Sequence, residues 1–161
     1  MENCVLFNKE YQTMERRGIE PPRAYYIPFN EREKIRYSNG IINREKSSRF
    51  ISLNGEWYIK EYIGIERLTD ISERLTAKIS VPSCVQLNGY DHIQYINSRY
   101  PFPVDPPRVP NDNPVYHYRK TFNLKLKSGE KYYLNFEGVD SFFYLFVNGE
   151  KVGFSQISHA T

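Results

Sequence analysis

The sequence predicts an all-β protein built from antiparallel strands. Aromatic residues make up 16% of the 161 residues, with 14 Tyr and 10 Phe against a single Trp, and aromatic side chains favour sheets. Apolar and polar residues alternate along several short segments, which is the period of a strand with one buried face. Asn148-Gly149 lies between two apolar runs, a pattern typical of a type I′ hairpin turn. These observations together favour an antiparallel β-sandwich.

The first two strands are expected at Gly55–Tyr62 and Ala77–Val81. Trp57 and Ile59 would share one face of the first strand, and a lone Trp on such a face is expected in the core. A short helical turn is expected over Asp70–Leu75, because Asp70 and Glu73, three positions later, have the spacing of a capping box.

Later strands are expected at Val115–Leu124, Lys131–Phe136 and Phe142–Val147. Alternation in the first of these would place Tyr116 and His117 on opposite faces. The last run is apolar on both faces, as in a strand at the centre of a sandwich.

Residues 1–49 differ from the rest of the chain. They are polar, follow no clear period, and are interrupted at Glu20-Pro21-Pro22 and again at Pro28. Proline fixes φ and removes a backbone donor, so this region is expected to be extended. The predicted division is therefore an extended N-terminal arm at 1–49 and a sandwich domain at 50–161.

Composition excludes several classes of partner. The formal net charge is +3, and no basic run is interleaved with aromatic residues, so no nucleic-acid partner is expected. No apolar stretch is long enough for a signal peptide or a bilayer span, which indicates no membrane partner and a cytoplasmic location. Cys4 and Cys84 lack metal-ligand spacing and are expected to be free thiols.

Catalysis by these residues alone finds little support. His92, His117 and His159 do not have the spacing of helical metal ligands, and the chain has no phosphate-binding glycine loop or G-x-S-x-G elbow. A pair of glycosidase carboxylates is a spatial arrangement that sequence spacing does not show.

The most unusual segment is the loop at residues 95–114, which contains six of the ten prolines. A long stiff loop at the rim of a sandwich is a common place for binding residues. Polar candidates on it are Asn97, Asp105, Asp112 and Asn113. The amide of Asn97 offers a donor and an acceptor to a sugar hydroxyl, and the alternative is that these side chains cap turns.

A series of short motifs follows one another from about residue 19 to the end of the chain. They are Ile19-Glu20-Pro21-Pro22, Tyr26-Ile27-Pro28, Leu53-Asn54-Gly55-Glu56-Trp57, Val81-Pro82-Ser83, Gly89-Tyr90-Asp91, Tyr95-Ile96-Asn97-Ser98-Arg99-Tyr100-Pro101, Pro106-Pro107-Arg108-Val109-Pro110, Asn113-Pro114, Phe136-Glu137-Gly138-Val139-Asp140-Ser141, Val147-Asn148-Gly149 and Val152-Gly153. In this order they resemble the N-terminal region of the large bacterial β-galactosidases of glycoside hydrolase family 2.

The resemblance implies a jelly-roll, galactose-binding-like β-sandwich that continues for several strands beyond Thr161 in the family, so the sandwich is expected to be incomplete here. It also implies that the two catalytic glutamates lie in a barrel domain outside residues 1–161. In the family, the asparagine that Asn97 matches reaches into the barrel's active site and binds the galactosyl group. The expected substrate of the whole enzyme is a terminal β-galactoside, and the expected partners are the remaining domains.

Three further expectations follow from the resemblance. Gln156 matches a ligand of a structural magnesium and is the candidate metal residue. The acidic and amide partners are not recognisable around Arg16-Arg17-Gly18, so no cofactor is assigned to this segment, whereas Mg and Na are expected for the full-length enzyme. The N-terminal segment contributes to subunit contacts in the family, so a homo-oligomer is expected. The alternative function is a free-standing lectin-like module without catalysis.

Overall fold

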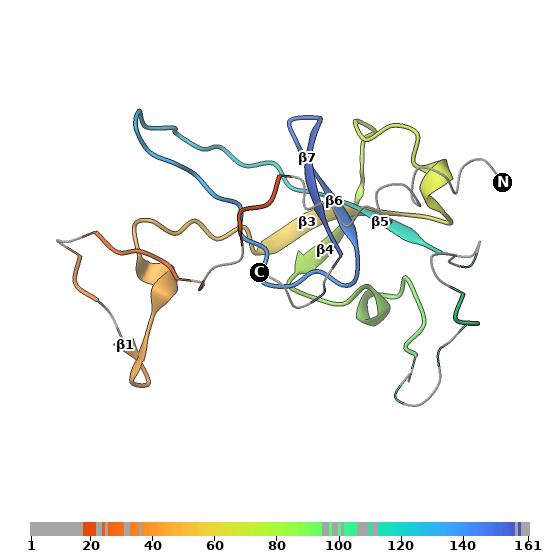
Figure 1. Cartoon of the computed structure of the whole chain (residues 1–161), viewed down its shortest axis with the longest axis horizontal. Helices are drawn as coiled ribbons and strands as arrows, with labels where there is room; N and C mark the ends of the chain where they lie inside the picture. The colour runs from red at the N-terminus through yellow and green to blue at the C-terminus, as the bar shows by residue number, and fades with distance from the viewer. Residues whose placement is uncertain are drawn as a thin grey trace.

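The described part of the chain is all-β and antiparallel, which confirms the predicted fold class at that level. A computed structural model describes residues 18–21, 24, 26–30, 33–35, 37–94, 97, 100, 102–105, 110, 113–156 and 158. No helix among these residues is long and apolar enough to cross a membrane. The elements in chain order (Figure 1) are β1 (Tyr37–Ser38), β2 (Ile41–Ile42), the 3₁₀ turn η1 (Arg44–Lys46), β3 (Gly55–Tyr62), η2 (Ile65–Arg67), β4 (Ala77–Val81), η3 (Val85–Asn88), β5 (Val115–Arg119), β6 (Phe143–Val147) and β7 (Glu150–Ser155).

β3 is the central strand of a three-stranded sheet with the order β4-β3-β5. β4 pairs with the first part of β3 and its ladder stops at Ile59 opposite Ala77. β5 pairs on the other side, from Tyr58 to Tyr62. After Ile59, the edge of β3 that faced β4 therefore has no described strand beside it. The bounds of β3 and β4 confirm the two predicted strands.

The two faces of this sheet differ in polarity. Ile59 has 0% exposure and is the most deeply buried large side chain among the described residues. On the opposite face, Lys60 lies directly across from His117. Trp57, which was expected in the core, is half-buried, and its indole N–H donates to the Leu53 carbonyl at 2.7 Å. Ile59 and Ile79 are therefore buried on the apolar face, and Tyr62 is buried on the other face beside Lys60.

The segment 63–76 lies against the polar face and is held there by Arg119. The guanidinium of Arg119 donates to the backbone carbonyl of Glu73 at 2.7 Å and also to that of Ile71. These bonds satisfy backbone acceptors that a strand or helix would otherwise pair. Leu75, at the end of the segment, is only 6% exposed, so the segment also adds apolar surface to the core.

The carboxylate of Glu73 makes the second attachment of this segment. It accepts a hydrogen bond from the Lys60 ammonium and another from the Tyr62 hydroxyl at 2.7 Å. The bond from Lys60, followed by that from Tyr62, lowers the pKa of the Glu73 carboxyl below its usual value. Both bonds come from β3, so a loop glutamate is tied directly to the central strand.

The predicted helical turn over Asp70–Leu75 is wrong, because the structure has no helix there. Residues 71 and 72 form only a tight turn. Asp70 does act as a cap, since its carboxylate accepts the Ser72 N–H at 2.7 Å. A capping box also needs Glu73 to bond the N–H of the cap residue. The Glu73 carboxylate instead accepts hydrogen bonds from Lys60 and Tyr62 on β3. The second hydrogen bond of a capping box is therefore missing, and no helix forms.

β6 and β7 form a separate antiparallel hairpin, which crosses in front of the three-stranded sheet in the view of Figure 1. Asn148 has φ of 53° and Gly149 has φ of 90°, as both central residues of a type I′ turn require, and this confirms the predicted turn. Phe154 is 4% exposed and lies 5.9 Å from the ring of Phe142. β6 pairs only with β7 among the described residues, so the predicted central position of this strand is not seen there.

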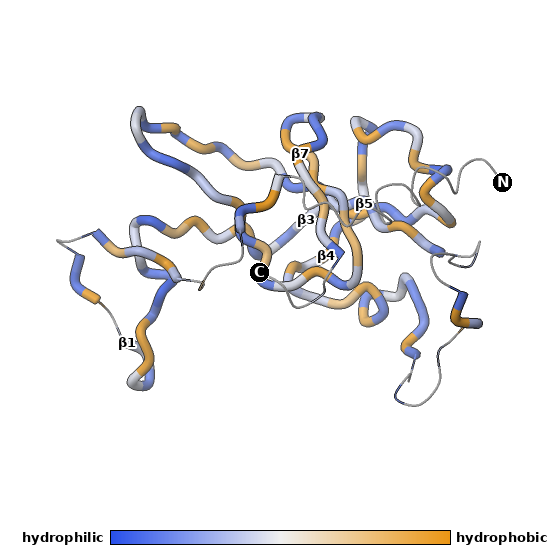
Figure 2. The backbone as a smooth tube through the Cα atoms, viewed as in Figure 1, coloured by the Kyte–Doolittle hydropathy of each residue, from blue (hydrophilic) through white to orange (hydrophobic). Residues whose placement is uncertain are grey.

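The segment 120–138 departs from the sequence prediction. Strand β5 ends at Arg119, and the run Lys131–Phe136 makes no ladder among the described residues. The two runs form a long projecting hairpin (Figure 1) whose course carries several hydrophobic stretches (Figure 2). Its turn is held by a side chain, since the Tyr132 hydroxyl accepts the Lys127 N–H at 3.0 Å. Alternation predicted strands here, but a ladder also needs a neighbouring strand.

The described part of the N-terminal arm is not extended throughout. β1 and β2 form a two-stranded hairpin that projects from the rest of the molecule (Figure 1). Arg49 ties the arm to the 120–138 hairpin, because its guanidinium bonds Glu130 at 2.8 Å. Ser47, 4% exposed, donates to the Pro28 carbonyl at 2.5 Å. Residues 1–17 lie outside the described residues.

Replacement of Ile59 by alanine should be the most destabilising apolar truncation in the three-stranded sheet. The side chain is fully buried, and Ile→Ala changes at such positions cost about 2–5 kcal/mol of unfolding free energy. Urea denaturation followed by fluorescence measures the loss. Ile63→Ala is the matched control, because Ile63 is 71% exposed and its loss should stay within about 0.5 kcal/mol. Equal losses in the two variants would contradict the assigned core.

Replacement of Glu73 by glutamine should destabilise the chain at neutral pH and have little effect in acid. The folded pKa of this carboxyl is lowered, so the folded state binds its proton less readily than the unfolded state. Its contribution to stability is therefore present above the unfolded pKa and is lost as the pH falls through the folded pKa. The measurement is the difference in urea midpoint between wild type and Glu73→Gln at pH 7 and at pH 3. Tyr62→Phe should also lower the urea midpoint more at pH 7 than at pH 3, by a smaller amount than Glu73→Gln. A difference in midpoint that is the same at both pH values would refute the role assigned to the Glu73 carboxylate.

Candidate functional site

The proline loop leaves the sheet after β4 through a compact capped turn. η3 ends at Asn88 and is capped by Gly89, whose φ of 81° is a left-handed conformation that glycine adopts at little cost. The Asn88 side-chain amide donates to the Cys84 carbonyl at 2.8 Å, and the Tyr90 N–H donates to the Val85 carbonyl at 3.3 Å. The chain therefore reaches Tyr90 in a fixed direction.

The base of the loop is closed by two tyrosines from its opposite ends. Tyr90 precedes the loop and Tyr116 follows it on β5, and their rings meet edge to face with centroids 6.1 Å apart. The Tyr116 hydroxyl donates to the Glu61 carboxylate on β3 at 3.1 Å. Burial, and then this hydrogen bond, raises the pKa of Tyr116. An edge-to-face pair contributes about 0.5–1.5 kcal/mol, so the aromatic contact joins both ends of the loop to the sheet.

Asn97, the predicted sugar contact, lies on this loop between β4 and β5 and is exposed. Asp105 is also exposed, whereas Asn113 is half-buried where the chain enters β5. Asp112 lies outside the described residues. An exposed amide on a loop closed at its base can meet a ligand presented by another domain, and its donor and acceptor match one sugar hydroxyl.

Gln156, the predicted metal ligand, directly follows β7 and is half-buried. Its Oε1 atom is buried and accepts no hydrogen bond from any described residue, which is a costly state for an amide oxygen. The arm passes close to this strand, because a Cβ on Gly18 would lie 1.7 Å from the Val152 carbonyl oxygen. The arm therefore lies close to the strand that precedes Gln156.

A magnesium site needs more than this one oxygen. Mg²⁺ takes six ligands, usually including carboxylates and waters. Among the described residues there is no group of three or more His, Cys, Asp or Glu side chains placed to hold a metal ion. The described residues therefore do not by themselves make a magnesium site around Gln156.

The sequence did not single out the residues that close the loop. Tyr90, Tyr116 and Glu61 are far apart along the chain, and tyrosines are too numerous in this protein for one pair to stand out. The only available signal was the motif Gly89-Tyr90-Asp91, which places an aromatic residue directly after a left-handed glycine.

Comparison with known proteins identifies the family. Residues 50–161 match the family described as "Glycosyl hydrolases family 2, sugar binding domain". The chain is 43% identical over 145 residues to the beta-galactosidase of Staphylococcus xylosus, an alignment of 89% of this chain and 14% of that protein. It is 42% identical over 142 residues to the beta-galactosidase of Actinobacillus pleuropneumoniae, covering 86% of this chain and 13% of that protein.

The chain thus spans about a seventh of the length of these relatives. The family match covers all of the three-stranded sheet, the proline loop and the β6–β7 hairpin. The all-β antiparallel structure of the described residues agrees with the predicted sandwich. The chain belongs to glycosyl hydrolase family 2, through the sugar binding domain of that family.

Proposed function

We propose that the chain is the N-terminal sugar-binding domain of a β-galactosidase that hydrolyses terminal β-D-galactosides. The observation that carries the proposal is the proline loop, which presents Asn97 at the surface from a base fixed by Tyr90 and Tyr116. Alignment of most of the chain with beta-galactosidases supports the substrate class. The domain would take the jelly-roll form that the resemblance implies.

The chemistry of the whole enzyme would be retaining glycoside hydrolysis. One carboxylic acid protonates the leaving oxygen while a second carboxylate attacks the anomeric carbon, and water then releases the sugar from the covalent intermediate. Both carboxylates belong to the barrel domain of the family. The role of this chain is to bind and orient, because the Asn97 amide would hydrogen-bond the galactosyl group as it reaches the barrel.

The metals expected for the full-length enzyme add one role for this chain. Gln156 would supply an oxygen ligand from the end of β7, with the remaining ligands coming from outside the described residues. The buried and unpartnered Oε1 atom supports this assignment. The role proposed for Gln156 is structural, and no step of the proposed hydrolysis involves this residue.

The rival function is a lectin-like module that binds sugar without chemistry. A sandwich fold is compatible with both functions. The relatives favour the enzyme, because they are beta-galactosidases of which this chain matches only a small part.

Asn97→Ala in the full-length polypeptide should lower kcat/KM for a chromogenic β-galactoside by about two- to tenfold. The loss corresponds to one hydrogen bond of roughly 0.5–1.5 kcal/mol, and it grows if the bond tightens in the transition state. Steady-state kinetics measure this, and the melting temperature should fall by little, because truncation of an exposed side chain costs little stability.

Two controls accompany this measurement. Asn54→Ala alters another exposed asparagine, directly before β3, and should leave kcat/KM unchanged. The 161-residue chain alone should show no turnover, because it lacks both carboxylates. Unchanged kinetics in Asn97→Ala, or a large fall in melting temperature, would assign Asn97 to a structural cap.

We also propose that the isolated chain self-associates. Along the 120–138 hairpin, Phe122, Leu126 and Tyr133 are 45%, 73% and 52% exposed, and no strand ladder covers this hairpin among the described residues. Exposed apolar surface and unpaired strand-like backbone are templates for association. Light scattering over a dilution series should show dimers or larger species. A monomer at every concentration, with a sharp cooperative melt, would refute this.

A further inference from the structure

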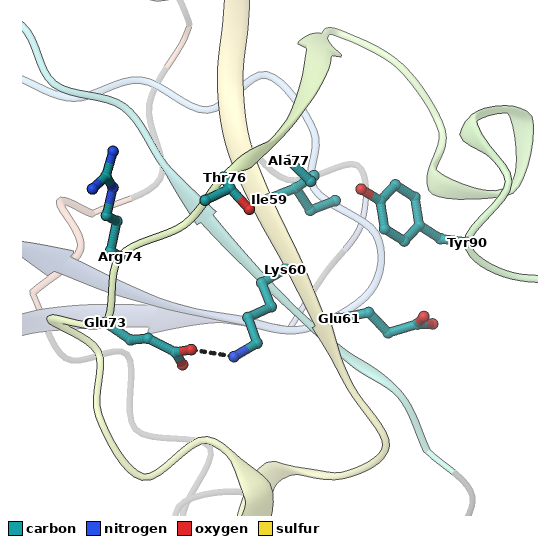
Figure 3. Close-up of a pocket in the computed structure, with 8 residues that line it drawn as sticks. All are labelled: Ile59, Lys60, Glu61, Glu73, Arg74, Thr76, Ala77 and Tyr90. Atoms are coloured by element: carbon teal, nitrogen blue, oxygen red, sulfur yellow. Dashed lines mark hydrogen bonds and ion pairs between the residues drawn. The ribbon is translucent and has the colours of Figure 1, made fainter.

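We propose that a depression beside β3 is a binding site for a neutral saccharide, separate from the contact made by Asn97. The depression has a volume of about 360 Å³, at the lower end of the roughly 300–1,000 Å³ typical of small-molecule sites. It is lined by Ile59, Lys60, Glu61, Glu73, Arg74, Thr76, Ala77 and Tyr90 (Figure 3).

The depression exists because the β4 ladder is shorter than β3. Pairing stops at Ile59 opposite Ala77, while β3 continues to Tyr62. The chain before Ala77 turns away into the segment that Arg119 and Glu73 hold against the other face. The edge of β3 from Lys60 onward is left without a described strand, so backbone groups that face this edge lack a ladder partner there.

Side chains around this edge carry polar groups that the described residues do not use. No described residue hydrogen-bonds the Thr76 hydroxyl, the Tyr90 hydroxyl or the second carboxylate oxygen of Glu61, whose first oxygen accepts from Tyr116. In Figure 3 the Tyr90 hydroxyl points toward Thr76 and Ile59, and Glu61 extends below the Tyr90 ring. The Thr76 and Tyr90 hydroxyls and the Glu61 carboxylate thus belong to residues that line the same depression.

The charges around the depression favour a neutral ligand. Lys60 and Arg74 are cationic and Glu61 and Glu73 are anionic, so the formal charges cancel. Lys60 and Glu73 also form an ion pair, which leaves neither available to neutralise an ionic ligand. A neutral ligand with many hydroxyl groups bonds both signs of group without leaving a charge unpaired.

The walls favour a pyranose over a peptide. Tyr90 supplies an aromatic ring that packs edge to face with Tyr116 at a centroid distance of 6.1 Å, and the exposed Ala77 adds apolar surface to the same space. Sugars present apolar C–H faces as well as hydroxyls, and such faces pack on aromatic rings. The open edge covers only the residues from Lys60 to Tyr62, which is short for the addition of a strand.

The test is a titration of the 161-residue chain, labelled with ¹⁵N, with methyl β-D-galactopyranoside. Saturable amide shifts should centre on Lys60–Tyr62, Thr76, Ala77 and Tyr90, with a dissociation constant on the order of millimolar, because the site is open and its contacts are few. Glucuronate, which adds a negative charge, should bind more weakly than the neutral sugar.

Variants identify the groups responsible. Tyr90→Ala should abolish saturation, and Thr76→Val and Glu61→Gln should each weaken binding by about two- to tenfold, the worth of one hydrogen bond. Tyr37→Ala is the matched control, because Tyr37 is 64% exposed on the β1–β2 hairpin and its loss should leave the titration unchanged. If the spectrum of Tyr90→Ala shows that this variant does not fold, the affinities of Thr76→Val and Glu61→Gln test the proposal in its place.

Three outcomes would overturn the proposal. These are the absence of saturable shifts at these residues, tighter binding of glucuronate than of the neutral sugar, and equal affinity in wild type, Thr76→Val and Glu61→Gln. Shifts caused by an extended peptide but not by the sugar would identify a strand-addition site instead. The titration measures binding and not turnover, so its failure is distinguishable from failure of the role proposed for Asn97.

Discussion

The attachment of segment 63–76 to the polar face of the sheet determines the arrangement around it. Glu73 accepts two hydrogen bonds from β3, and Arg119 on β5 donates to carbonyls of the same segment. Side chains at half-exposed positions are weak stabilisers one at a time, because solvent screens them. Here several such bonds act on one short segment from two strands, and their joint effect fixes where β4 can begin. The open edge of β3 is a direct result.

Sequence reasoning was most successful where a local signal alone defines an element. The bounds of β3 and β4 were predicted because alternation begins after Gly55 and Pro82 ends the second run, and the Asn148-Gly149 turn was predicted from its need for positive φ. It failed where the outcome depends on a distant partner. Glu73 has the spacing of a helix cap, but Lys60 and Tyr62 lie closer to its carboxylate in the folded chain. The run Lys131–Phe136 alternates as a strand should, and no described strand lies beside it to complete a ladder.

The candidate site shows the same division. Asn97 could be selected from the sequence because prolines and a family motif surround it, and both are local properties. The base of its loop could not, since Tyr90 and Tyr116 meet only after β5 has paired with β3. The surroundings of Gln156 are likewise non-local, because Gly18 of the arm lies close to Val152 on β7. The candidate ligand residues Asn97 and Gln156 could therefore be selected from the sequence, whereas the residues that fix the base of the loop could not.

Glu61 connects the two features that concern ligands. One of its carboxylate oxygens holds the Tyr116 hydroxyl and so helps to close the proline loop, while the side chain also lines the depression at the open edge of β3. A ligand bound to the other oxygen would draw on the same carboxylate that fixes the loop. Coupling between two sites requires a shared element that both can bias, and Glu61 would be that element if a ligand binds in the depression. The Tyr116 ring also contacts Tyr90, and Tyr90 lines the same depression. A ligand in the depression would therefore contact a residue that fixes the direction of the proline loop.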